Sequence, residues 1–131
     1  MADFLDSNIV LYAMSGGGAK CATAHRLLAS APCISTQVIN ECSHVMRRKL
    51  LWEPTRIATE LGFVIDLTQV IEFGINEIRA AWRIGERYGY GHYDSLIIAT
   101  AIAAGCATLY TEDMQHGQVI DGRMMLINPF L

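Results

Sequence analysis

The stretch HYDSLIIATAIAAGCATLYTED, residues 92–113, decides the fold of this 131-residue chain. Residues 95–111 carry no charge, but Gly105 interrupts the run, so we expect a buried helix followed by a buried strand and no membrane span. The predicted helix covers residues 93–104 and the predicted strand covers residues 107–110. A buried helix that leads directly into a buried strand is typical of α/β proteins with a parallel sheet.

The rest of the chain continues this alternation of apolar runs and helical periodicities. We predict strands at residues 4–6, 33–35, 63–67 and 124–127, and helices at about 9–14, 19–31, 36–50, 54–62 and 68–88. Strands that alternate with crossover helices imply a single α/β domain over residues 1–131, a three-layer α/β/α sandwich with a mainly parallel central sheet. In such sheets the functional site lies outside the carboxyl ends of the strands.

Local signals define several boundaries. The glycines at residues 16–18 lack the lysine of a phosphate-binding loop, so we interpret them as a turn between two helices. Ser35 or Thr36 is predicted to cap the helix that follows. The apolar stripe of the predicted 68–88 helix comprises Ile71, Ile75, Ile78, Trp82 and Gly85. We expect this stripe to pack in the core of the molecule, with a second copy of the chain as the alternative partner.

Composition restricts the class of protein. Hydrophobic residues make up 52% of the chain and charged residues 18%, which is ample apolar material for one core. The net charge of −3 argues against binding of nucleic acid by bulk electrostatics, so a polyanion needs local basic residues or a bound cation. The four cysteines form no C-x-x-C pair and no zinc spacing with histidine, which favours reduced thiols in a cytoplasmic protein.

Asp94 gives the clearest chemical signal. On the predicted helix it shares one face with Ile97, Ile98, Ala101 and Ile102. A charge at the end of such an apolar stripe is costly unless it is paired, neutralised or bound to a metal ion. The alternative is an ordinary N-terminal acid stabilised by the helix dipole.

Three further acids are predicted near the same edge of the sheet. Asp6 ends the first strand, Asp113 follows the strand at 107–110, and Glu41 lies on the flank of the apolar face of the 36–50 helix. Each alone is compatible with a capping or solvated residue. Gathered together, carboxylates about 4 Å apart repel by roughly 4 kcal/mol per pair at an effective dielectric near 20. A hard divalent cation such as Mg²⁺ or Mn²⁺ relieves this repulsion and suits phosphodiester hydrolysis.

Four segments that contain these acids resemble the motifs of PIN-type ribonucleases. They are FLDSNIVLYA (residues 4–13), STQVINE (35–41), HYDSLIIATA (92–101) and LYTEDMQHGQ (109–118). Their order and spacing match, and the last has the form common among VapC-type toxins. The resemblance runs from about residue 3 to the C-terminus.

The resemblance implies a metal-dependent endoribonuclease. It assigns metal binding and catalysis to four acids, namely Asp6, Glu41, Asp94 and Asp113, with Mg²⁺ or Mn²⁺ as the cofactor. It assigns a supporting role to Ser7, Asn8 and Thr111, which would orient carboxylates or bound water. Some relatives have a further acid where this chain has Gln115 and His116, which leaves open whether a second ion binds.

The same resemblance implies partners. The substrate would be RNA, cut to leave a 5′-phosphate and a 3′-hydroxyl, and the chain would be the toxin of a type II toxin–antitoxin pair whose antitoxin covers the acids. Homodimerisation is also expected. Arg48, together with Arg47 and Lys49, is a candidate for holding the RNA backbone, although basic residues at a helix end are also explained by the helix dipole.

Three alternative functions differ in what they require. A haloacid-dehalogenase-type phosphatase needs a second aspartate where the chain has Asn8. A phospho-acceptor receiver domain needs a lysine after a late strand, where the chain has Thr111. A catalytically inactive PIN domain that only binds protein or RNA stays open, and it should show little affinity for Mn²⁺.

Overall fold

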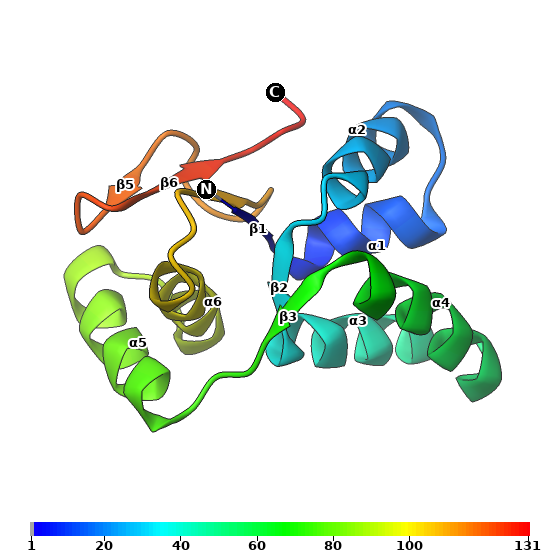
Figure 1. Cartoon of the computed structure of the whole chain (residues 1–131), viewed down its shortest axis with the longest axis horizontal. Coiled ribbons are helices and arrows are strands. Elements are labelled where there is room, and N and C mark those ends of the chain that lie inside the picture. Colours follow the sequence, from blue (N-terminus) through cyan, green and yellow to red (C-terminus); the bar gives the residue numbers. More distant parts are fainter. Residues whose placement is uncertain (1) are drawn as a thin grey trace.

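The computed structural model describes residues 2–131, in which short strands alternate with helices (Figure 1). The strands are β1 (Asp3–Leu5), β2 (Cys33–Ser35), β3 (Gln69–Ile71), β4 (Thr108–Tyr110), β5 (Val119–Ile120) and β6 (Met124–Ile127). The helices are α1 (Ser7–Ser15), α2 (Gly18–Ala29), α3 (Thr36–Arg48), α4 (Pro54–Leu67), α5 (Ile75–Tyr88) and α6 (His92–Ala103). The strands predicted at residues 4–6, 33–35, 107–110 and 124–127 are confirmed to within one residue, whereas β5 was not predicted.

The strands form one sheet in the order β3-β2-β1-β4-β6-β5. Every neighbouring pair is parallel except β5 and β6, which confirms the mainly parallel sheet. Leu5 of β1 is in register with Tyr110 of β4, and the N–H of Asp6 donates to the carbonyl of Tyr110 at 3.0 Å. The register therefore places Asp6 beside Thr111 at the carboxyl edge of the sheet.

The helices cover both faces of this sheet. In Figure 1, α1–α4 gather on one side of the strands, and α5 and α6 lie together on the other. Phe4, Leu109 and Leu126 of the central strands are completely buried between these layers. Gly85 allows α5 and α6 to approach closely, because a Cβ atom there would lie 3.3 Å from the Ser95 hydroxyl. The predicted α/β/α sandwich is confirmed.

The strand predicted at residues 63–67 is wrong, because these residues continue helix α4. Gly62 was interpreted as the end of the helix, but a Cβ atom at that position would meet no neighbour, and the helix passes through it without a break. Leu61 and Val64, three residues apart, are buried on one helical face. The helix ends where the Thr68 hydroxyl donates to the Val64 carbonyl at 2.8 Å.

The helix predicted over residues 68–88 is wrong in its first part, and its apolar stripe is only partly correct, because Ile71 and Ile78 pack against the core. Ile71 ends β3, and α5 begins only after Gly74, whose N–H donates to the Glu77 carboxylate at 2.7 Å. The side chains of Ile75 and Trp82 are 64% and 63% exposed, so they do not pack in the core as expected. The fully buried residues of α5 are Ala81 and Ile84, which were not part of the predicted stripe.

The smaller local predictions are confirmed. The glycine run at 16–18 separates α1 from α2, with Gly18 at a φ of +81°. The Ser35 hydroxyl caps α3 by accepting the Val38 N–H at 3.3 Å. The four cysteines are unbonded thiols, three of them buried. Along residues 2–131, no helix has both the length and the apolar character that crossing a bilayer requires.

Candidate active site

Asp6 is the most constrained acid of the candidate site. It follows β1 directly and caps α1, and its side chain is only 3% exposed. Its Oδ1 accepts the Ser7 N–H at 2.7 Å, and its Oδ2 accepts the Thr111 hydroxyl at 2.7 Å. Burial raises the pKa of Asp6 to about 6, and the charges of Glu41 and Asp94 add to the rise. Asp6 is thus held firmly in an environment that disfavours its ionised form.

Asp113 is joined to the same edge of the sheet through polar neighbours. The Asn8 side-chain amide donates to Asp113 Oδ2 at 2.9 Å, and the Asp113 N–H donates to the Thr111 hydroxyl oxygen at 3.2 Å. Thr111 therefore receives a hydrogen bond from Asp113 and gives one to Asp6. Asn8 and Thr111 thus contact the acids that they were predicted to support, and their functional role stays a prediction.

Asp94 lies in the first turn of α6 and is half-buried. Burial raises the pKa of Asp94, and the charge of Asp113 adds to this effect. Asp94 also raises the pKa of Asp6. These mutual influences indicate that Asp94 lies within electrostatic reach of both acids, as expected for a shared anionic site.

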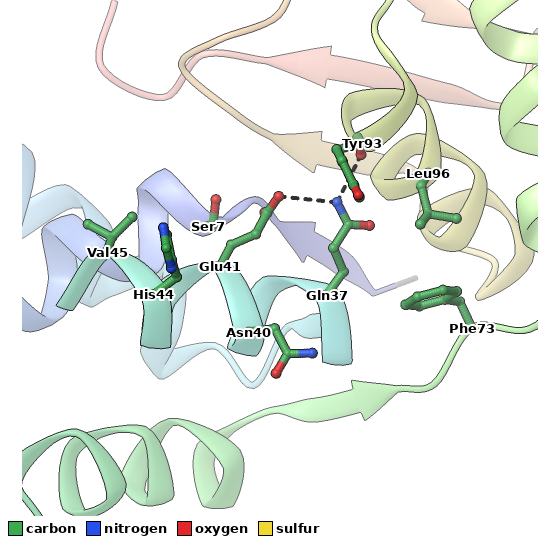
Figure 2. Close-up of a pocket in the computed structure, with 9 residues that line it drawn as sticks. All are labelled: Ser7, Gln37, Asn40, Glu41, His44, Val45, Phe73, Tyr93 and Leu96. Carbon is green, nitrogen blue, oxygen red and sulfur yellow. Dashed lines mark hydrogen bonds between the residues drawn. The ribbon is translucent and has the colours of Figure 1, made fainter. Parts of the chain in front are cut away.

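Glu41 approaches from α3, on the other side of the site. The Gln37 side-chain amide donates to Glu41 Oε2 at 3.3 Å and to the Tyr93 carbonyl at 2.9 Å (Figure 2). Burial raises the pKa of the neighbouring Cys42 thiol, with added contributions from the charges of Glu41 and Asp6. Gln37 thereby connects α3 to the N-terminus of α6, where Asp94 resides.

The adjacent acid Glu112 has a different environment from Asp113. Its carboxylate accepts hydrogen bonds from the Lys20 ammonium and from the Tyr12 hydroxyl, the latter at 2.6 Å. The hydrogen bond from Lys20 contributes most to lowering the pKa of Glu112. Glu112 is therefore ion-paired with Lys20, whereas Asp113 has no basic partner among residues 2–131.

The donor set fits a hard divalent cation. Among residues 2–131 no basic side chain forms an ion pair with Asp6, Glu41, Asp94 or Asp113. Carboxylate oxygens are the ligands that Mg²⁺ and Mn²⁺ prefer. Across the same residues, no three potential ligand side chains are gathered closely enough to hold an ion together. Mutual repulsion opposes closer approach of these acids unless a cation lies between them.

A cavity of about 740 Å³, here termed the α3 cavity, opens next to Glu41 (Figure 2). It is lined by Ser7, Gln37, Asn40, Glu41, His44, Val45, Phe73, Tyr93 and Leu96. Of these residues, only Ser7 and Glu41 were predicted from the sequence as site residues. The helical spacing of the five that lie on α3 is a usable signal, but nothing in the sequence indicates that Phe73 comes from the β3–α5 connection to face them.

The basic residues predicted to hold RNA do not share one environment. The Arg47 guanidinium donates to the Trp52 carbonyl at 3.2 Å and lies 3.8 Å from the Glu53 carboxylate. Arg48 and Lys49 are exposed. Only Arg48 continues the row of Gln37 and Glu41 along α3, because residues four, seven and eleven apart share a helix face.

Comparisons with known proteins agree with the fold. The sequence profile of the PIN domain family matches residues 4–120. No functionally curated protein matches the chain. A toxin–antitoxin complex from Klebsiella pneumoniae is similar in structure, with a TM-score of 0.73 and 19% identity over 99% of this chain and 98% of that chain. VapBC2 from Rickettsia felis, bound to a promoter DNA fragment, has a TM-score of 0.71 and 24% identity over 96% and 97%.

A third similar structure is VapC20 from Mycobacterium tuberculosis, described as a toxin that cleaves the sarcin-ricin loop. Its TM-score is 0.69, with 21% identity over 86% of this chain and 90% of that chain. At such identities the structural matches establish the fold alone. The family profile, however, spans most of the sequence and includes all four acids, and this protein therefore belongs to the PIN domain family.

Proposed function

We propose that this protein is an endoribonuclease that depends on Mg²⁺ or Mn²⁺. The observation that supports the proposal most is electrostatic: Glu41 and Asp94 both raise the pKa of Asp6, Asp113 raises that of Asp94, and none of the four has a basic partner among residues 2–131. Keeping several carboxylates ionised at one edge of a sheet costs folding free energy. Such a cost is expected at a site that is completed by a cation.

In the proposed site Asp6, Asp94 and Asp113 hold the ion, and Glu41 acts through a water molecule. A bound Mg²⁺ or Mn²⁺ would supply Lewis acidity toward the phosphodiester. Thr111 fixes the carboxylate of Asp6 through its hydroxyl group. Asn8 orients the carboxylate of Asp113 through its side-chain amide. In the hydrolysis, water adds to phosphorus in line with the ribose 3′-oxygen, which leaves and yields a 5′-phosphate and a 3′-hydroxyl.

We propose further that the chain is the toxin of a type II toxin–antitoxin pair. The similar structures from Klebsiella pneumoniae and Rickettsia felis are described as a toxin–antitoxin complex and as VapBC2. The four unpaired acids offer a natural contact for such a partner, because a basic antitoxin side chain would neutralise them and block the ion. A small neighbouring gene for a DNA-binding antitoxin would support this role.

A homodimer is proposed from the exposed face of α5. Ile75 and Trp82 are more than half exposed, although isoleucine and tryptophan are usually buried at least in part. A second copy of the chain would cover them. Sedimentation of the wild-type protein and of the Trp82→Glu variant tests this contact, which is wrong if both proteins sediment as monomers.

The nuclease proposal is tested with Asp94→Asn and a matched control, Glu112→Gln. Asp94→Asn should abolish Mn²⁺-dependent cleavage of single-stranded RNA and weaken Mn²⁺ binding measured by calorimetry, while circular dichroism shows an intact fold. Glu112→Gln should retain cleavage, because the Glu112 carboxylate is bound to Lys20. Full activity of Asp94→Asn contradicts the assignment. Wild-type protein that neither cleaves RNA nor binds Mn²⁺ is an inactive binding module.

A further inference from the structure

The α3 cavity extends the site beyond the acids. Figure 2 shows Glu41 and Ser7 between His44 on one side and Phe73 and Leu96 on the other. The cavity therefore adjoins the acidic site at Glu41 and continues into a region lined by aromatic and aliphatic side chains. Its volume of about 740 Å³ lies within the usual range of small-ligand sites. None of the four acids except Glu41 lines it, so the proposed metal chemistry does not explain it.

Gln37 lines this cavity, and its buried side-chain oxygen is a hydrogen-bond acceptor without a partner. Both bonds of its amide nitrogen go to acceptors, the Glu41 carboxylate and the Tyr93 carbonyl, so the amide cannot be turned around. Its Oε1 is buried and has no hydrogen-bond partner, and the residue is only 6% exposed. A buried oxygen without a donor is rare and destabilising in folded proteins. A ligand amino group that reaches this oxygen, after a small shift of the Gln37 side chain toward the cavity, would supply the missing donor.

The aromatic residues of the cavity indicate the kind of ligand. The Tyr93 side chain is 67% exposed, and Phe73 is half-buried beside Leu96. Exposed aromatic side chains next to a nuclease site are suited to stack on unpaired RNA bases, which offer a π face together with hydrogen-bond donors on the base edge. Asn40, exposed at the same cavity, offers a further donor and acceptor.

The unpaired Gln37 oxygen would also discriminate among the bases, because it accepts a hydrogen bond only from a base that has a suitable donor. Adenine, cytosine and guanine each carry an exocyclic amino group that projects from the base edge. The N3–H of uracil lies between two carbonyl oxygens, which would face the Gln37 oxygen and be buried without donors. A buried acceptor in a cavity that Leu96 also lines therefore favours an amino-bearing base over uracil.

We propose that the α3 cavity binds an unstacked base of the RNA substrate next to the scissile phosphate, with Gln37 Oε1 accepting a hydrogen bond from its exocyclic amino group. The inference rests on the proposed ribonuclease function and adds a preference for adenine, cytosine or guanine over uracil at one position beside the cut. Phe73 supplies the stacking surface. Gln37 acts as a residue that determines specificity.

The first test compares how the wild-type protein and its variants cleave a pool of randomised single-stranded RNA. Sequencing of the ends of the products reports the base preference at each position beside the cut. Wild-type protein should disfavour uracil at one position beside the cut. Phe73→Ala should lower kcat/KM about tenfold on the preferred base, in line with the loss of one stacking contact. Gln37→Met should reduce the preference against uracil. The matched control Phe63→Ala, which alters an exposed aromatic residue on α4, should match the wild type.

The second test measures binding without cleavage, using fluorescence anisotropy of short oligoadenylate and oligouridylate on the Asp94→Asn variant. Tighter binding of oligoadenylate that is lost with Phe73→Ala supports the base site. Equal binding of both oligonucleotides overturns it, as does an unchanged cleavage preference in both Phe73→Ala and Gln37→Met. If Phe73→Ala instead weakens only the binding of the antitoxin, the cavity is a contact surface for that partner and the inference is wrong. Absence of cleavage with selective binding intact contradicts the nuclease proposal alone.

Discussion

The two sides of the candidate site differ in how firmly their polar groups are held. On the strand side, formed by Asp6, Asn8, Thr111 and Asp113 at the ends of β1 and β4, each of these side chains is hydrogen-bonded to another member of the set. Asp6 and Thr111 are also almost completely buried. This side is organised before any ligand arrives, as expected for groups that must hold a charge at a fixed position.

The helix side is formed by one face of α3 and is open to solvent. Asn40, His44 and Arg48 are exposed, and among residues 2–131 no partner forms a hydrogen bond to their side chains. Gln37 and Glu41 are joined to one another. Side chains that are not fixed in the protein remain available to adapt to a ligand. If the proposed function is correct, the strand side would mainly hold the ion and the helix side, apart from Glu41, would mainly contact the RNA.

The largest expected effect is the difference in kcat/KM between variants of Asp6 and of Glu41. Asp6→Asn removes a ligand that two neighbours hold in place, so kcat/KM for single-stranded RNA should fall by more than about 100-fold, beyond the usual cost of losing a supporting group. Glu41→Gln should cost only about tenfold, because Glu41 is half-buried and is proposed to act through water. Kinetics at saturating Mn²⁺ measure both variants. Equal losses would show that the two sides share the chemistry.

The second prediction concerns the pH dependence of the free energy of unfolding, which we derive mainly from Asp6 on the strand side. The pKa of Asp6 rises from 3.8 to about 6 on folding, so the folded protein binds this proton more tightly than the unfolded chain. The resulting stabilisation is complete below pH 3.8 and is lost as the pH rises through 6, with a total of about 3 kcal/mol. About 1 kcal/mol of this should appear between pH 7 and pH 5. Asp94, whose pKa is also raised, adds in the same direction.

Urea unfolding at pH 5, 6 and 7 checks this dependence in protein treated with a chelator. The metal-free protein should be more stable at pH 5 than at pH 7, whereas Mn²⁺ binding should strengthen as the pH rises through 6, since the ion and the proton compete for Asp6. Asp6→Asn should lose the part of the pH dependence that comes from this residue. Metal-free protein that becomes steadily less stable from pH 7 to pH 5 contradicts the prediction.

The sequence predicted the strand side well, and the reason is physical. Asp6 and Asp113 follow short apolar runs, and the carboxyl ends of neighbouring parallel strands must meet at one edge. Asp94 stands out because it interrupts an uncharged segment. The prediction of Asp113 and not Glu112 as a site acid came from the motif, and the ion pair of Glu112 with Lys20 is consistent with it.

The helix side and the region around β3 could not be predicted from the sequence. Phe63 and Ile65 have the β-branched or aromatic character of a strand, yet they are exposed on α4 because Leu61 and Val64 determine which face is buried. Because the strand was predicted at residues 63–67, the residues of β3 were assigned to a helix. The position of Phe73 next to α3 could then not be predicted. Gln37 resembles any polar residue of a helix start, and only its burial reveals the unpaired oxygen.

The third prediction tests how much the hydroxyl of Thr111 contributes to the strand side. Thr111→Val keeps the shape but removes the hydrogen bond to Asp6, so metal affinity should fall about 10- to 100-fold. The free energy of unfolding at pH 7 should fall by about 1–3 kcal/mol, because the buried carboxylate loses a donor. Thr111→Ser retains the hydroxyl and is the matched control. Identical Mn²⁺ affinities for the valine and serine variants would show that Thr111 does not orient Asp6.

The smallest effect is expected on the helix side, where Arg48 and Arg47 form a matched pair. Arg48 lies on the same face of α3 as Glu41 and the α3 cavity, whereas Arg47 is bound to the Trp52 carbonyl and lies near Glu53. Arg48→Ala should weaken binding of single-stranded RNA about threefold and reduce the slope of log affinity against log salt by about 0.7, the value for one phosphate contact on a single strand. Arg47→Ala should leave the slope unchanged and cost less than about 1 kcal/mol of stability, because its ion pair is exposed. Equal slopes of log affinity against log salt for the two variants would show that Arg48 does not contact the RNA backbone. The helix side would then contribute base recognition only.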